Sequence, residues 1–242
     1  MIFTLFIIGS AIGSFLGVCV ERLNRGETII KGRSHCDSCG HTLSWYDLIP
    51  LLSFLSLRGR CRYCKKSLSW QLPAIEIVTG MALVYSVSPL FLLFCSLIVI
   101  FFSDLKYGII PDEAIVLGSL SAIFYNFYNV YNFYNDYNLF SAAAAAGFLG
   151  IIYLLSRGRG LGFGDVKLGF LMGLFLGWPR IIFALYFSYI LGAIIILPLL
   201  FLKKKSLRDT ISFGPFLIIG TLCAHFLPEP FLTAVTLLLR WW

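Results

Sequence analysis

Two aspartates interrupt strongly apolar stretches of this sequence. Asp104 lies in "FFSDLKYGIIPDE" and Asp165 in "GFGDVKL", and a lysine, Lys106 or Lys167, follows each of them two residues later. A carboxylate is costly inside a bilayer, so an acidic residue at an apolar segment indicates a functional site. Two carboxylates in a partly dry site share one proton, so the charged member can activate water while the protonated member polarises a carbonyl. The pair therefore indicates aspartyl peptide hydrolysis.

Glycines surround the second aspartate, at Gly162 and Gly164. An extended substrate must approach the backbone closely there, and a side chain at either glycine would obstruct it. The alternative is that each aspartate sits at the membrane interface and pairs with its own lysine. Asp112 and Glu113 also stay open as partners in a carboxylate pair, because they follow Asp104 closely in the chain.

Four cysteines form a second group that could carry chemistry. They make two C-x-x-C pairs, and two such pairs can complete a tetrahedron of thiolates around zinc. The alternative is two disulfides, which are rare in the reducing cytosol. Four thiolates leave no open position for water, so the zinc would be structural. The predicted ligands are Cys36, Cys39, Cys61 and Cys64.

The composition predicts the elements that must position these residues. Hydrophobic residues make up 59% of the 242 residues and charged residues only 13%, which indicates an all-α polytopic membrane protein. At about 20 residues per crossing there is room for about eight transmembrane helices. We expect them near 2–20, 73–88, 89–104, 113–128, 139–155, 166–178, 181–202 and 213–228. The predicted domains are a first transmembrane helix (1–20), a small inserted cytoplasmic zinc module (21–72) and a transmembrane aspartyl protease domain (73–242).

The basic residues predict the orientation. If the N-terminus lies outside, only Arg180 and Arg240 among the lysines and arginines fall on the outer side, as the positive-inside rule requires. The zinc module and both aspartates are then cytoplasmic. The net charge of +7 follows from this topology and from attraction to the lipid bilayer, so it calls for no nucleic acid partner.

Two further segments are predicted to serve structure. The tripeptide repeat at 124–138 matches neither helix nor strand periodicity, and we expect an external loop there. Small residues at 142–147, and Gly169, Gly173 and Gly177 at four-residue spacing, indicate helix faces that approach each other closely.

Several motifs, taken in order, resemble the type IV prepilin peptidase family, the bacterial leader peptidase and N-methyltransferase group of GxGD aspartyl proteases. They are "GSFLGVCVERL", the two C-x-x-C pairs, "DLIPLLSFLSLRGRCRYCKKSLSWQLPAIEIVTG", "DLKYGIIPDE", "GFGDVKL" and "SFGPFLIIG". One departure is "SWQLPAIE", where the family more often has an Arg-Tyr pair before the proline.

The resemblance implies a function for these motifs. Asp104 and Asp165 would be the catalytic pair, with Gly162 and Gly164 as the motif glycines and Lys106 and Lys167 in support. The substrates would be prepilins or pseudopilins, cut after the leader glycine at the cytoplasmic face of the bacterial inner membrane. Methylation of the new N-terminus by S-adenosylmethionine would follow, with Glu76 and the zinc knuckles as candidates for its support.

Two other classes of protein compete with this prediction. A proton-coupled transporter also carries carboxylates in its spans, but it favours midplane positions and internal repeats. A non-catalytic membrane scaffold with a zinc ribbon would tolerate changes at both aspartates. The sequence leaves the oligomeric state and the particular prepilin open.

Overall fold

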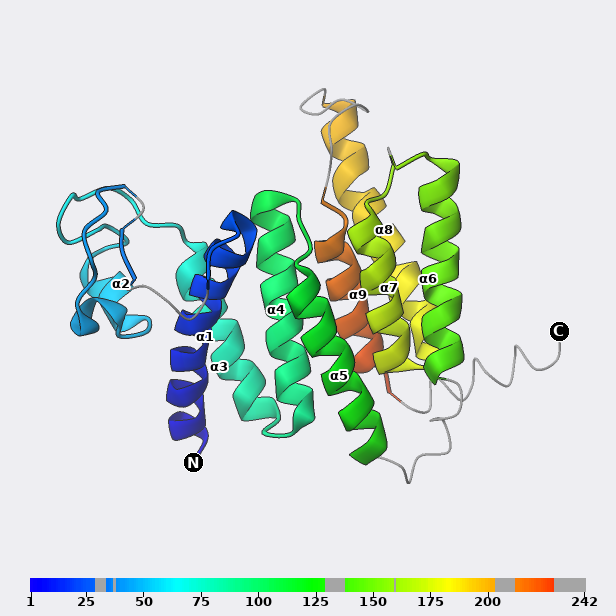
Figure 1. Ribbon diagram of the computed structural model, residues 1–242, viewed down its shortest axis with the longest axis horizontal. Helices are drawn as coiled ribbons and strands as arrows, with labels where there is room; N and C mark the ends of the chain where they lie inside the picture. The colour runs from blue at the N-terminus through cyan, green and yellow to red at the C-terminus, as the bar shows by residue number, and fades with distance from the viewer. Residues whose placement is uncertain (29–33, 37, 129–137, 159, 203–211, 229–242) are drawn as a thin grey trace, which may run out of the picture. The chain divides into compact units, whose positions relative to one another are not determined.

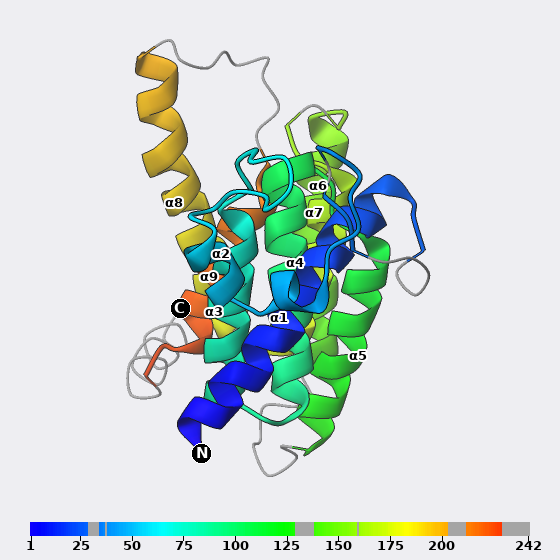
Figure 2. The same cartoon turned by 90° about the vertical axis from the view of Figure 1, so that its left-hand side faces the viewer.

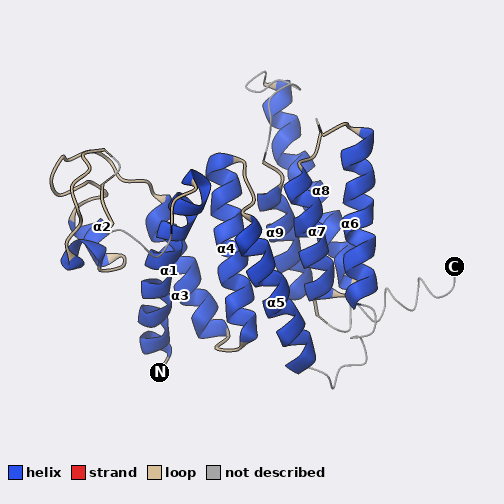
Figure 3. Cartoon of the chain, viewed as in Figure 1, coloured by secondary structure: helices blue, strands red, loops and turns tan. Residues whose placement is uncertain are grey.

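The computed structural model describes residues 1–28, 34–36, 38–128, 138–158, 160–202 and 212–228 (Figure 1). Within these ranges the chain is helical and contains no strand (Figure 3), apart from two isolated bridges that join His35 to Thr42 and Arg60 to Ser67. The predicted all-α fold class is therefore confirmed.

All eight predicted spans coincide with helices, whose ends lie within a few residues of the expected positions. Two short elements, η1 and α2, belong to the cysteine module. The elements are α1 (Ile2–Arg25), η1 (Trp45–Leu48), α2 (Leu52–Ser56), α3 (Gln71–Tyr85), α4 (Pro89–Tyr107), α5 (Asp112–Tyr128), α6 (Asn138–Leu155), α7 (Phe163–Leu176), α8 (Arg180–Phe201) and α9 (Gly214–His225).

Helix α1 continues past the expected end at residue 20. It runs to Arg25 because no helix-breaking residue intervenes, and it ends where Gly26 adopts a left-handed conformation with φ of 67°. A glycine in this conformation is a common helix terminator. The extra turn keeps Glu21 and Asn24 on the helix.

Four of the described helices are long and apolar enough to cross a bilayer, namely α1, α4, α6 and α8 as far as Pro198. Helices α3 and α9 are apolar but shorter. The chain is therefore a multi-pass membrane protein, and the count of eight spans stays a prediction.

By its contacts the chain divides into two compact units, residues 1–107 and 108–242. In the first unit, α1 packs along α3 and both contact α4. Glycines allow the close approach of α1 to α3, since a Cβ on Gly13 would lie 2.8 Å from the Cα of Glu76. The predicted three-part division at residues 20 and 72 stays a prediction.

In the second unit, α7 contacts α5, α6, α8 and α9. Its glycines face α6, as predicted from their spacing. A Cβ on Gly173 would lie 2.5 Å from the Cα of Ala142, and one on Gly169 would lie 2.5 Å from a methyl carbon of Leu149. These contacts fix the direction of the helix that begins beside Asp165.

The tripeptide repeat is partly helical, because α5 extends to Tyr128. The expected loop is therefore wrong for residues 124–128, and also for Asn138, which begins α6. The predicted loop residues 129–137 lie outside the described residues.

Candidate functional site

The four predicted metal ligands come together. Their sulfur atoms all lie within 4.8 Å of one another, and the Sγ atoms of Cys36 and Cys64 are 3.9 Å apart. A tetrahedral site with zinc–sulfur bonds of about 2.3 Å needs sulfurs separated by about 3.8 Å. Within the described residues, this cluster of four cysteines could therefore hold a metal ion.

Two similar turns build this metal site. In the first turn the amide of Gly40 donates to the carbonyl of Cys36, and in the second the amide of Lys65 donates to the carbonyl of Cys61. Both Gly40 and Lys65 have positive φ, of 67° and 60°. The same backbone path thus presents each C-x-x-C pair, as its spacing predicts.

The thiols of the cluster differ in acidity. The amide of Cys64 has the largest effect on Cys61 and, together with the amide of Tyr63, lowers the pKa of Cys61 to about 7 against partial desolvation. The amide of His41 acts to lower the pKa of Cys39, but desolvation and the neighbouring Cys36 and Cys64 raise it to about 11. Cys61 is therefore better prepared than Cys39 to meet a metal ion as a thiolate at neutral pH.

Asp47 joins η1 to the second turn. Its carboxylate accepts hydrogen bonds from Nε of Arg62 at 2.7 Å, from the hydroxyl of Tyr63 at 3.2 Å and from the amide of Ser44 at 3.3 Å. Desolvation acts to raise the pKa of Asp47, but these donors, Arg62 first, lower it below its usual value. The lowered pKa means that the ionised form stabilises the folded module.

Asp47→Asn should therefore loosen the module at neutral pH, and a chelator should remove its metal several-fold faster. The contribution of Asp47 is present above the pKa of the unfolded chain and is lost as pH falls through the lowered pKa of the folded form. The rate of metal transfer to a colorimetric chelator measures this effect. Equal rates for Asp47→Asn and the unsubstituted protein at pH 7 would show that Asp47 does not brace the site.

Glu76, the candidate support for methyl transfer, is a buried residue of α3. Its Oε2 accepts a hydrogen bond of 2.8 Å from the amide of Leu51, the residue before α2. Leu51 has a φ of 61°, a conformation that costs energy for a residue with a side chain. Glu76 thus ties the cysteine module to α3.

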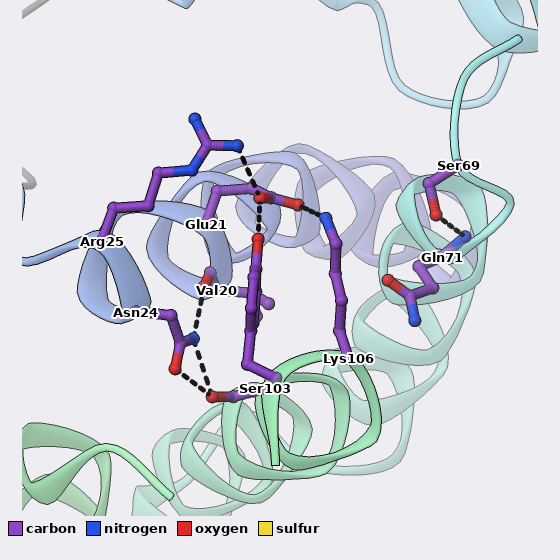
Figure 4. A network of polar contacts seen from close by, with 9 residues as sticks. Val20, Glu21, Asn24, Arg25, Ser69, Gln71, Ser103 and Lys106 are labelled. Atoms are coloured by element: carbon purple, nitrogen blue, oxygen red, sulfur yellow. Dashed lines mark hydrogen bonds and ion pairs between the residues drawn. The ribbon is translucent and has the colours of Figure 1, made fainter. Parts of the chain in front are cut away.

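Asp104 lies in the last turn but one of α4 and is only 5% exposed. A polar network joins its part of α4 to the end of α1 (Figure 4). Nδ2 of the Asn24 side chain donates to Oγ of Ser103 at 2.8 Å, and the Ser103 hydroxyl also lies 3.0 Å from Oδ1 of the same side chain. Glu21 accepts from both Lys106 and Tyr107. The residues on either side of Asp104 are therefore held by α1.

Asp165 lies in the first turn of α7 and is 7% exposed. Its Oδ2 accepts a hydrogen bond of 3.0 Å from the amide of Gly162, while its own amide donates to the carbonyl of Gly162. A helix N-terminus favours a negative charge at this position. The side chain of Asp165 is therefore held at the start of α7 by Gly162.

The two predicted supporting lysines pair with other acids. Lys106 is bound to Glu21, and Nζ of Lys167 lies 2.6 Å from Oδ1 of Asp112. Asp112 is mostly exposed, unlike the two buried aspartates. Asp104 and Asp165 are thus buried, whereas the alternative candidate carboxylates, Asp112 and Glu113, are exposed.

Gly164 faces the chain segment before α5. A Cβ on Gly164 would lie 3.1 Å from the Cβ of Ile110, a distance tighter than ordinary contact. Its small size therefore allows close packing against Ile110, in addition to the predicted access for substrate. At Gly162 a Cβ would lie 3.4 Å from Oδ2 of Asp165.

A cavity of about 570 Å³ lies in the first unit, within the range typical of small-molecule sites. The cysteine module, α1 and α3 contribute its walls. Carboxylates, cations and leucines line it together, among them Glu21, Glu76, Asp47, Arg62, Leu48 and Leu72.

Sequence reasoning missed Glu21, Asn24 and Asp47. The available signal for the first two was polar side chains three residues apart, at the end of an apolar helix, where one helix face is shared. Asp47 carried no comparable signal, because its partners Arg62 and Tyr63 lie fifteen and sixteen residues away.

These features define a multi-pass helical membrane protein with a module of four clustered cysteines that could hold a metal ion, and with buried carboxylates at helix ends. Residues 7–89 match the model of the bacterial peptidase A24 N-terminal domain, and residues 91–197 match that of the type IV leader peptidase family. The chain belongs to the type IV prepilin peptidase family, as its motifs predict.

Curated relatives carry the name prepilin leader peptidase/N-methyltransferase. The protein from Myxococcus xanthus is 34% identical over 203 residues, which are 79% of this chain and 61% of that protein. The Bacillus subtilis relative is 28% identical, with 93% of this chain and 94% of the relative covered. The Aeromonas salmonicida relative is 29% identical, with 89% and 87% covered. No solved structure matches the chain.

Proposed function

We propose that this chain removes the short basic leader from type IV prepilins or pseudopilins and then methylates the new N-terminus. Leader cleavage and N-methylation are the activities named for the relatives of its family. The single observation that carries the residue assignment is the burial of Asp104 and Asp165, at 5% and 7% exposed. A transporter or a non-catalytic scaffold is not favoured, since the whole family is described as peptidases.

The two carboxylates divide the acid and base roles. Asp165 sits at a helix N-terminus and accepts the amide of Gly162, so we assign it as the ionised base. Asp104 lies near the C-terminal end of α4, where the helix dipole disfavours a negative charge. We therefore assign Asp104 as the protonated acid.

The reaction then needs one water molecule. Asp165 accepts a proton from the water molecule as the water oxygen forms a bond to the scissile carbonyl carbon. At the same time Asp104 donates its proton to the carbonyl oxygen. Collapse of the tetrahedral intermediate breaks the C–N bond. The leaving amine takes the proton from Asp165, and the carboxyl product returns a proton to Asp104.

Glu21→Gln tests whether the network beside Asp104 positions the acid. The change removes the charge that holds Lys106, so we expect turnover to fall about 10- to 100-fold. Loss of the Glu21–Lys106 pair changes the charge at the end of α4, so the pH profile of cleavage should change. Glu21→Asp should restore part of the rate. A profile identical to that of the unsubstituted enzyme would exclude this positioning role.

The cavity in the first unit is the proposed site of methyl transfer. S-adenosylmethionine, when bound, supplies a methyl group on a positively charged sulfur. Glu76 provides a carboxylate in the cavity wall, and Leu72 provides an apolar surface for the base of the ligand. Glu76 also fixes the wall of this cavity through the amide of Leu51.

Zinc is the proposed ion of the cysteine cluster, because four thiolates at tetrahedral spacing suit zinc and leave it no open position. Its role is structural. We further propose that the protein lies in the bacterial inner membrane with its N-terminus outside, and with the zinc module and both aspartates on the cytoplasmic side. The supporting observation is the distribution of lysine and arginine along the chain.

Incubation with a synthetic prepilin, followed by mass analysis, tests the function as a whole. The enzyme should release the leader peptide, and S-adenosylmethionine should add the mass of one methyl group to the mature product. An intact prepilin after incubation with zinc-loaded, lipid-reconstituted enzyme would refute the proposal.

A further inference from the structure

The contacts of the short helix α2 place it alongside α1, well before the C-terminal end of that helix. Its first flanking residue, Leu51, donates its amide to Glu76 of α3. Glu76 in turn packs against Gly13, which lies twelve residues before the end of α1. At about 1.5 Å per residue, this contact is about 18 Å along α1 from its C-terminal end. Figures 1 and 2 both show α2 beside α1 and not beyond its end.

Helix α2 presents apolar side chains away from the protein. Leu52 is 66% exposed and Leu55 is 70% exposed, and both lie on an element level with the apolar span of α1. Leu48, just before this segment, is also exposed. Exposure of these leucines to water costs free energy, whereas contact with the acyl chains around α1 does not.

The backbone around α2 is adapted to a dry environment. The amide of Leu51 donates to Glu76, that of Leu52 to Pro50, that of Ser53 to Ile49, that of Leu55 to Leu51, and that of Leu57 to Ser53. A segment in lipid needs such internal partners, since no water is present to replace them. Glu76 thus supplies the acceptor that water would provide at a soluble helix start.

Exposed charged and aromatic residues flank α2 in the chain. Arg58, Arg60, Lys65 and Lys66 are exposed and follow α2 in the chain, and exposed Trp45 and Trp70 lie in η1 and directly before α3. Cations favour anionic lipid head groups, and tryptophan favours the membrane interface. The module is also joined at both ends to membrane helices, α1 and α3.

We infer that α2 inserts into the leaflet on the module's side of the membrane, with Leu52 and Leu55 in contact with acyl chains. The cysteine module is then held against the bilayer at a fixed depth, and the lipid bilayer covers its apolar face. This inference depends on the membrane placement of α1 and α3, and it is independent of the peptidase and methyltransferase activities.

A photo-crosslinking amino acid, p-benzoylphenylalanine, at position 52 or 55 tests the inference. The full-length protein is reconstituted in vesicles of phosphatidylethanolamine and phosphatidylglycerol without prepilin, irradiated and analysed by mass. Lipid adducts should form at both positions. The matched control is position 42, where the exposed Thr42 lies on the first cysteine turn and should give no lipid adduct.

Retained zinc in each variant shows that the module is folded, so the result can be interpreted. Adducts to a second protein copy, or no adduct at positions 52 and 55, would overturn the inference. Lipid adducts at all three positions would also overturn it, because they would indicate an unspecific collapse onto the membrane. Leader cleavage, assayed on the same vesicles with prepilin added afterwards, reports separately on the proposed function.

Discussion

Asp104→Asn and Asp165→Asn should each reduce leader cleavage by about 10²- to 10⁴-fold, the range for loss of a general acid or base. Asparagine keeps the size of the buried side chain but cannot take up or release the proton that the hydrolysis needs. The measurement is the rate of mature product formation from a synthetic prepilin, with purified enzyme in lipid. Methylation of a peptide that already lacks its leader should continue in both variants, because neither aspartate lines the proposed methyl-transfer cavity.

Two exposed acids serve as matched controls for this experiment. Asp112→Asn and Glu113→Gln remove a carboxylate from the start of α5, where both residues are exposed. The Lys167–Asp112 pair is more exposed than the Lys106–Glu21 pair, and solvent screens an exposed ion pair, so we expect each control to retain most of the cleavage activity. Full cleavage by Asp104→Asn or Asp165→Asn, or a complete loss in one of the controls, would transfer the catalytic role to a different carboxylate.

Cys61→Ser should have the largest effect on the module. Removal of one thiolate lowers metal affinity, and metal binding supplies about 10 to 16 kcal/mol in comparable small zinc modules. We expect the zinc content to fall from one equivalent per chain to near zero after brief dialysis against a chelator. The module should then become sensitive to protease, and methyl transfer should be lost.

Cys223→Ser is the control, since Cys223 is an exposed cysteine outside the cluster, on α9. It should keep one equivalent of zinc. The affinity of the unsubstituted protein should fall as pH decreases, because protons compete with the metal for the thiolates. Zinc retention by Cys61→Ser at the level of Cys223→Ser would show that the four cysteines do not form the metal site.

The sequence alone was enough to place the long helices and the metal ligands. Long apolar runs predict helices such as 139–155, and in the structure this helix is α6, Asn138–Leu155. The two C-x-x-C pairs predict the sulfur cluster equally well. Both signals are local, because hydrophobic length and ligand spacing depend on residues that are close together in the chain.

The tertiary structure decided the polar partners and the position of α2 along α1 and α3. The two lysines that follow the aspartates pair with Glu21 and Asp112, which lie 85 and 55 residues away in the chain. Glu76 likewise accepts from Leu51, which lies 25 residues away in the chain. Such pairings depend on how helices pack in three dimensions, and residue type and local spacing carry no record of that packing.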